Sequence, residues 1–282
     1  MASGTNVSAP YGLKPINLIG GQVFAGSTRA LPIQYGYATN IFYGDFVKVL
    51  RGSVTRASVT TGTDSAQFDG VFLGCSYTDP VTKQKQFSQY WPASTLAGDA
   101  IAYVVDDPDT VFKAAVCSSG TTMASGAVAM IGANLSMVNN TGNVNTGNSK
   151  NAVLAPTATP VTTVLPVRCV GVVEDTAFSY TATGSSTGAS ITLTGSGLPA
   201  AIPVGTSVAY YASNGQLIET GSFVDTAASA GATTVELNAA VAVPGGVTAI
   251  PASSTIVFTV YPEVLVKANL LVHAYYSSTS GQ

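Results

Sequence analysis

The segment from Ala9 to Asp45 reads APYGLKPINLIGGQVFAGSTRALPIQYGYATNIFYGD, and its character determines how the rest of the chain is interpreted. It is rich in Tyr, Phe, Ile, Leu, Gly and Pro, and Lys14, Arg29 and Asp45 are its only charged residues. It shows no sustained 3.6-residue period, and Gly and Pro interrupt any alternation. Because such a segment cannot build its own core, we expect it to lie extended on another surface, in its own chain or in a neighbouring subunit.

Composition narrows the class of protein. Charged residues make up 9% of the 282-residue chain, whereas soluble domains average about 25%. The net charge is −3 and the Lys and Arg residues do not cluster, so we expect no nucleic-acid partner. No apolar run is long enough for a transmembrane helix, and the N-terminus lacks the pattern of a secretory signal. This profile favours β-structure with many turns and a surface largely covered by other protein.

Three cysteines, Cys75, Cys117 and Cys169, lie in apolar or small-residue surroundings. Their odd number and the absence of CxxC spacing argue against a disulfide framework or a zinc site. We therefore expect buried free thiols within strands, which fits folding in a reducing cytoplasm.

After the N-terminal segment the chain reads as short strands separated by turns. Strand character is found at residues 46–50, 54–59, 69–77, 100–105, 111–116 and 167–173. The region 123–137 fits either a short helix or a pair of strands. The Asn- and Gly-rich segment 139–151 has no periodicity and is predicted to be an exposed loop.

A second block of different composition begins near residue 179. Its strand candidates are residues 190–194, 207–211, 216–223, 233–237 and 255–260, and Asn214-Gly215 gives the strongest hairpin signal in the chain. A further strand-like run follows at 263–276, and it resembles the first part of the chain. The predicted fold is therefore all-β. It has an N-terminal arm (1–45), a sandwich- or barrel-like main domain (46–178 plus 261–282) and a small inserted β-domain (179–260).

The residues that catalysis would need are scarce. His273 is the only histidine, so a nucleophile–histidine–acid relay would have to use it, and it lies in a strand-like run. The neighbouring carboxylates Glu174 and Asp175 would point to opposite faces of a strand, which makes a poor acid–base pair. We predict no catalytic residue, no bound cofactor and no enzymatic activity; a glycan hydrolase remains the weakest alternative.

Two other groups admit a binding role. Asp106, Asp107 and Asp109 could ligate calcium, although no complete calcium loop surrounds them, and a turn at the end of a strand is the simpler interpretation. Trp91, with Tyr90 and Phe87, could form a platform for a sugar ring, although such clusters more often belong to a core or an interface. We predict no metal site.

Three stretches carry a resemblance to a known family. The first is APYGLKPINLIGGQVFAGSTRALPIQYGYATNIFYGDFVKV, followed by DGVFLGCSYTDP and AGDAIAYVVDDPDTVFKAAV. They resemble the capsid decoration (cement) proteins of tailed phages, especially marine and cyanobacterial podophages. The resemblance covers about residues 9–116 and, more loosely, 167–176 and 260–276, and it leaves 180–260 uncovered.

The resemblance implies a β-rich homotrimer that is assembled in the bacterial cytoplasm and bound to the outside of the virion head. Its partner would be the major capsid protein, and N-terminal arms would strap neighbouring capsid subunits together. The alternative is a head fibre or adhesin whose residues 180–260 contact a host-surface glycan or protein.

Apolar side chains of the N-terminal segment are the predicted capsid or subunit contacts, because aromatic and aliphatic anchors dominate protein interfaces. Packing of these residues on their own domain is the alternative. The predicted contact residues are Tyr11, Leu13, Ile16, Leu18, Ile19, Phe24, Leu31, Ile33, Tyr35, Tyr37, Phe42 and Tyr43.

Overall fold

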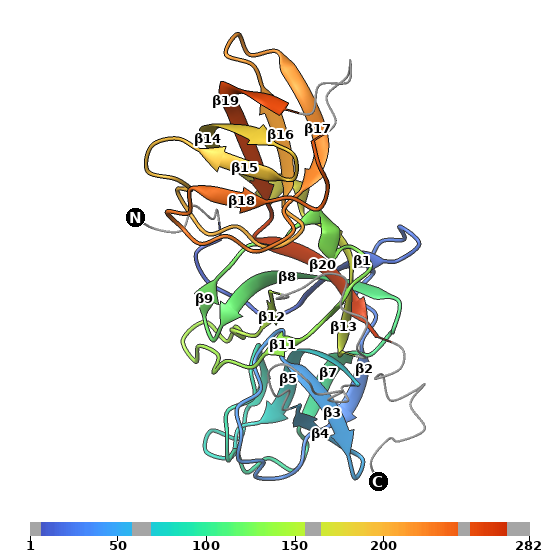
Figure 1. Cartoon of the computed structure of the whole chain (residues 1–282). Coiled ribbons are helices and arrows are strands. Elements are labelled where there is room, and N and C mark those ends of the chain that lie inside the picture. The colour runs from blue at the N-terminus through green and yellow to red at the C-terminus, as the bar shows by residue number, and fades with distance from the viewer. Residues whose placement is uncertain (1–6, 58–68, 156–164, 242–248, 270–282) are drawn as a thin grey trace.

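A computed structural model describes residues 7–57, 69–155, 165–241 and 249–269. Within these ranges the chain is all-β, as predicted, and its only helical elements are the single 3-10 turns η1 (Val128–Met130) and η2 (Glu174–Thr176). The strands form three sheets, which follow one another along the long axis of the molecule (Figure 1).

The first sheet, called the first barrel, has the order β2-β7-β5-β3-β4 and is nearly closed, because a parallel bridge joins Ile33 to Val54 beside its edge strands. Its interior is filled by Trp91, Phe72 and smaller apolar side chains. Its strands are β2 (Arg29–Pro32), β3 (Phe46–Leu50), β4 (Ser53–Arg56), β5 (Gly70–Thr78), β7 (Ile101–Val105) and β6 (Lys85–Ser88), which pairs with β5.

The middle sheet has the order β10-β13-β20-β8-β12-β11, and the long strand β8 also pairs with β1 and β9. One face of it packs in a core that includes Phe112, Met130 and Val266. Its strands are β1 (Lys14–Leu18), β8 (Thr110–Ser119), β9 (Thr122–Met123), β10 (Asn134–Leu135), β11 (Met137–Val138), β12 (Ala152–Leu154), β13 (Val167–Val172) and β20 (Glu263–Ala268).

The third sheet, called the inserted sheet, has the order β17-β16-β19-β14-β15-β18, and a bridge between Val224 and Leu237 brings its two edges together. It surrounds a separate core that includes Tyr210 and Phe258. Its strands are β14 (Phe178–Thr187), β15 (Ser190–Leu193), β16 (Ser207–Tyr211), β17 (Leu217–Phe223), β18 (Thr234–Glu236) and β19 (Ala249–Val260).

The inserted sheet lies between two strands that pair with each other. β13 precedes it and β20 follows it, and Val172 lies opposite Val264 in their antiparallel register. The chain therefore leaves the middle sheet at the end of β13 and returns to it at the neighbouring start of β20, as can be followed in Figure 1.

The N-terminal segment does not lie apart from these sheets. β1 pairs with β8 of the middle sheet, and β2 pairs with β7 of the first barrel. The segment was expected to lie either on its own chain or on a neighbouring subunit. In the isolated chain it pairs with strands of its own chain. The residues expected to form one main domain likewise divide between two sheets.

Several element predictions need correction. The long strand β14 was not predicted, because its Ser, Thr, Gly and Ala residues gave no apolar pattern. The region 123–137, expected to form a short helix or a pair of strands, holds the 3-10 turn η1, the strand β10 and the start of β11, and these two strands pair with β13 and β12 and not with each other. The predicted run 263–276 forms β20 only as far as Ala268, and residues 270–276 lie outside the described ranges, as do residues 58–59 of the predicted strand 54–59.

Candidate interaction surface

The predicted contact residues of the N-terminal segment divide by exposure. Leu13, Ile33 and Phe42 are buried in their own chain, so the alternative of packing on their own domain holds for these three in the isolated molecule. Ile16, Ile19 and Tyr35 are exposed, and Tyr35 reaches 61%. The others are half-buried: Tyr11, Leu18, Phe24, Leu31, Tyr37 and Tyr43.

Tyr11 is held by contacts within the chain. Its hydroxyl donates a hydrogen bond to the Glu263 carboxylate, which is only 3% exposed. The Lys113 ammonium lies 3.5 Å from the same carboxylate and 5.7 Å from the centre of the Tyr11 ring. Burial, the hydrogen bond and the nearby negative charge raise the pKa of Tyr11 well above its usual range. Tyr11 therefore fastens the N-terminal segment to the middle sheet.

An apolar row crosses the outer surface of the first barrel. The register places Pro32 opposite Ile101, Ile101 opposite Ser76, and Ser76 opposite Phe87. Residues directly opposite in antiparallel strands point to the same face, and Cys75 and Ala102 of the same strands lie in the core on the other face. Pro32, Ile101 and Phe87 are exposed, and Phe87 reaches 78%. The strands thus present apolar side chains to the outside.

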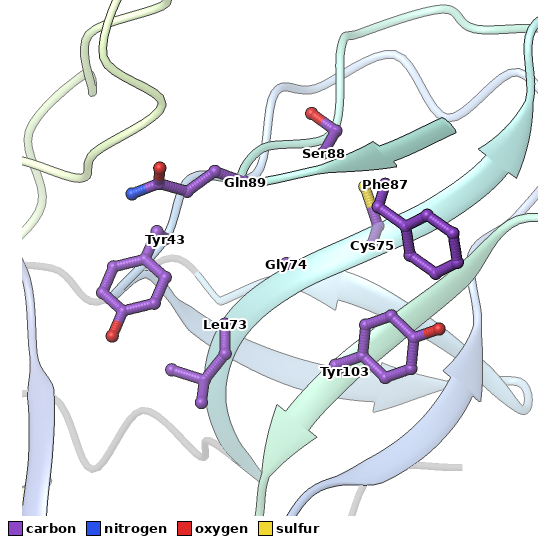
Figure 2. A pocket seen from close by; sticks show the side chains of 8 residues that line it. All are labelled: Tyr43, Leu73, Gly74, Cys75, Phe87, Ser88, Gln89 and Tyr103. Atoms are coloured by element: carbon purple, nitrogen blue, oxygen red, sulfur yellow. The ribbon is translucent and has the colours of Figure 1, made fainter. Parts of the chain in front are cut away.

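Beside this row lies an open groove of about 520 Å³, seen in Figure 2. The Phe87 and Tyr103 side chains stand on one side of Gly74, and Tyr43 and Leu73 stand on the other. Among the described residues, the lining consists of Tyr43, Leu73, Gly74, Cys75, Phe87, Ser88, Gln89 and Tyr103. None of these side chains is charged, so an uncharged, largely apolar partner fits the groove best.

Gly74 keeps the floor of the groove open. It sits at an irregularity in the pairing of β5 with β7, with a φ of +149° that other residues rarely adopt. A Cβ atom at this position would come within 3.0 Å of the Ser88 carbonyl oxygen. A side chain here would therefore both strain the backbone and fill the groove.

Three polar side chains of the groove, those of Tyr103, Ser88 and Gln89, already donate hydrogen bonds within the chain. The Tyr103 hydroxyl donates to Ser76 Oγ over 3.2 Å, and the Ser88 hydroxyl donates to the Tyr90 carbonyl over 2.6 Å. Gln89 Nε2 donates to Asn148 Oδ1 over 2.9 Å. Sugar recognition needs such groups to be available to the ligand, so this arrangement favours contact with a protein side chain.

Cys75 at the base of the groove is a poor nucleophile. Burial raises the pKa of its thiol to about 12, and its Sγ lies 3.5 Å from the Tyr90 carbonyl oxygen. The reactive form of a cysteine is the thiolate, which is scarce at neutral pH when the pKa is this high. Cys117 and Cys169 are also buried and free, as the sequence predicted.

A buried polar cluster is centred on the carboxylate of Asp45, two residues after Tyr43. Asp45 is fully buried and accepts hydrogen bonds from Ser149 Oγ at 2.6 Å and Asn151 Nδ2 at 2.9 Å. It also accepts one from the Phe42 amide at 3.0 Å, and Arg56 Nε lies 3.0 Å away. Burial raises the pKa of Asp45, while Arg56 and the hydrogen bonds oppose that rise.

This cluster corrects one prediction. The segment 139–151 was expected to be an exposed loop, yet Ser149 and Asn151 are buried. The reason is that both side chains serve the buried carboxylate of Asp45. The neighbouring residues Tyr43 and Asn148 add a short parallel bridge.

The other two groups that the sequence offered for binding, around Trp91 and at Asp106–Asp109, have other roles in the structure. Trp91 is fully buried and in edge contact with Tyr77, so it belongs to the core and forms no sugar platform. Asp106 pairs with Arg29 at 2.6 Å, and Asp109 pairs with Lys267 at 3.2 Å, so these carboxylates serve different cations. Asp107 accepts the Asp109 amide in a turn at the strand end.

Glu174 and Asp175 lie in η2, and His273 falls outside the described residues. Within the described ranges, no cluster of three or more His, Cys, Asp or Glu side chains could hold a metal ion. The helical turns found there are also too short to cross a membrane.

The sequence did not single out Ile101 or Tyr103 as surface residues. Residues 100–105 were predicted to form a strand, but all six are apolar or aromatic, so no polar residue marked an outward face. The available signal was the alternation of large Ile101 and Tyr103 with small Ala102, which marks two different faces.

Comparisons with protein-family models, with curated proteins and with solved structures gave no match to this chain. The functional argument therefore depends on its own residues.

Proposed function

We propose that this chain is a decoration, or cement, protein of a bacteriophage head. It would bind the outside of the shell and stabilise it by clamping neighbouring major capsid subunits. The observation that carries the proposal is the uncharged apolar row of the first barrel (Pro32, Ile101 and Phe87) together with the groove beside it. The resemblance of residues 9–116 to phage decoration proteins indicates that the partner is the major capsid protein.

The physical argument is that exposed apolar side chains gathered in one patch, unlike those scattered singly, are typical of protein contacts. Burial of apolar area contributes about 25 cal/mol per Å² removed from water. Ile16, Ile19 and Tyr35 in the N-terminal segment offer further area of this kind. The engaged polar groups of the groove favour a protein over a sugar.

The proposal includes a homotrimer that is made in the bacterial cytoplasm and carried on the outer surface of the virion. It includes no catalytic residue, no cofactor, no nucleic-acid contact and no membrane contact. Trimeric state rests on the family resemblance, and closed symmetry is the usual arrangement of homo-oligomers.

The direct test is co-sedimentation of the purified chain with empty heads of the phage that encodes it. A double variant, Phe87→Ser with Ile101→Ser, should bind heads at least about tenfold more weakly, since two apolar anchors are lost. Leu217→Ser in the inserted sheet is the matched control, because Leu217 is also half-exposed. Equal binding by the double variant and the control would contradict the proposal.

A head fibre or adhesin is the second candidate, favoured by one observation. The inserted sheet has its own core and brings its two edges together, so it forms a structural unit that could carry a binding function of its own. Replacing residues 178–260 by a short turn should leave head binding intact under the decoration function. Loss of adsorption to host cells by the same deletion would favour the adhesin.

A further inference from the structure

The outer face of the middle sheet, opposite its main core, gathers positive charge. The register places Lys14 opposite Lys113, and Arg168 opposite Lys267. Lys267 also lies opposite Val111, two residues from Lys113 on the same strand, so all four cations point to one face. They are four of the 11 Lys and Arg residues of the chain. Like charges directly opposite each other destabilise a sheet, so negatively charged groups near this face would stabilise it.

The described residues supply only part of that charge. Glu263 accepts from Tyr11 and lies 3.5 Å from Lys113, and Asp109 lies 3.2 Å from Lys267. Four cations against these two carboxylates leave two positive charges on the face. One belongs to Lys14, which stands 4.7 Å from the centre of the Tyr11 ring.

The other positive charge belongs to Arg168. Its side chain is exposed, and among the described residues it has no hydrogen-bond or ion-pair partner. Its guanidinium offers five donors in a fixed fork, which matches the two oxygens of a carboxylate.

A cavity of about 310 Å³ opens at this position. It is lined by Ile19, Arg168, Val170, Lys267, Ala268 and Asn269. The cationic groups come from neighbouring strands, and Ile19 and Val170 add aliphatic surface. Asn269 Nδ2 already donates to Asn134 Oδ1 over 3.2 Å and Lys267 already pairs with Asp109, which leaves the Arg168 guanidinium as the main group for a ligand.

We propose that this cavity binds a carboxylate of an acidic polypeptide segment. Arg168 would hold the two carboxylate oxygens, and Ile19 and Val170 would pack on the methylene groups of a glutamate. The aliphatic rim and the presence of only two cations distinguish the site from a nucleic-acid surface, which needs many cations and stacking rings. The site lies on a different sheet from the apolar row and does not depend on the decoration function.

The test is fluorescence anisotropy of a dye-labelled hexaglutamate peptide with the full chain at low ionic strength. Binding should be measurable, should weaken as salt is added, and should weaken about tenfold in Arg168→Gln, which loses one charge-assisted contact. Arg51→Gln is the matched control, because Arg51 is exposed at the turn between β3 and β4 of the first barrel. It should bind like the unchanged chain.

Three results would overturn the proposal. The first is no binding of hexaglutamate to the unchanged chain, and the second is equal binding by Arg168→Gln and Arg51→Gln. The third is competition by inorganic phosphate or by a single-stranded oligonucleotide that exceeds competition by unlabelled hexaglutamate. Arg168 has no partner to lose in the described structure, so thermal melting of Arg168→Gln should match the unchanged chain and show that the variant folds.

Discussion

The Ser149 hydroxyl donates a hydrogen bond to the Asp45 carboxylate over 2.6 Å, although the two residues are 104 positions apart in the chain. Both residues are buried. The bond joins the turn before β3 of the first barrel to the segment that leads into β12 of the middle sheet. The two sheets share the core that contains Phe46, Val71 and Phe112, and this buried polar contact joins them as well.

Replacing the buried carboxylate should test this connection. Asp45→Ala would leave Arg56, Ser149 and Asn151 without their common acceptor, and loss of one partner of a buried ion pair costs about 3–5 kcal/mol. Urea denaturation should show this loss in the free energy of unfolding. Asp99→Ala, which removes the exposed partner of Lys85, is the control and should cost much less. Equal effects would mean that the cluster contributes little.

The N-terminal segment should loosen when its anchor is shortened. Tyr11→Phe removes the hydroxyl that donates to Glu263 and should lower the free energy of unfolding by about 1–3 kcal/mol. Limited proteolysis should then cut within the N-terminal segment sooner than in the unchanged chain. Tyr35→Phe, at an exposed position, serves as the control. An unchanged cleavage pattern in Tyr11→Phe would contradict the anchoring role.

Two aromatic residues of the first barrel should behave in opposite ways. Trp91 is fully buried, and Trp91→Ala should cost about 3–5 kcal/mol of stability through the cavity it leaves. Phe87 is largely exposed, and Phe87→Ala should change stability by no more than about 0.5 kcal/mol. Thermal melting of the two variants gives the comparison. A strongly destabilised Phe87→Ala would mean that this ring packs on its own barrel and is not free for a partner.

The thiols should be protected in the folded chain. The pKa values are about 12 for Cys75 and about 11 for Cys117 and Cys169, because burial disfavours the thiolate. Thiol reagents at pH 8 should label the chain only after denaturant is added. In the unfolded chain these thiols would ionise near their ordinary pKa of 9.0. Their contribution to stability is therefore complete below pH 9 and is lost as the pH rises toward 11 or 12. Rapid labelling of the native chain at pH 8 would contradict this assignment.

Prediction from sequence succeeded where strands carry clear apolar patterns. Residues 46–50 and 207–211 form β3 and β16 with the predicted bounds, because each is flanked by turn residues. β14 could not be found in this way, since its Ser, Thr and Gly residues become a strand only through pairing with β19. Long-range pairing of this kind leaves no local signal.

The sequence pattern predicted the candidate interaction surface only in part. An apolar N-terminal segment was recognised, but its division into buried Leu13 and exposed Ile16 depends on which strand each residue meets. The burial of Ser149 and Asn151 follows from a carboxylate far away in the chain. Sequence gives the composition of such a surface, and the fold decides which members face outward.

Because Val172 pairs with Val264, the inserted sheet can be replaced without disturbing the strands on either side of it. The two points at which the inserted sheet joins the middle sheet are neighbours, so another compact module with adjacent ends could take its place without moving β13 or β20. This position is therefore suited to grafting a foreign domain whose two ends lie close together.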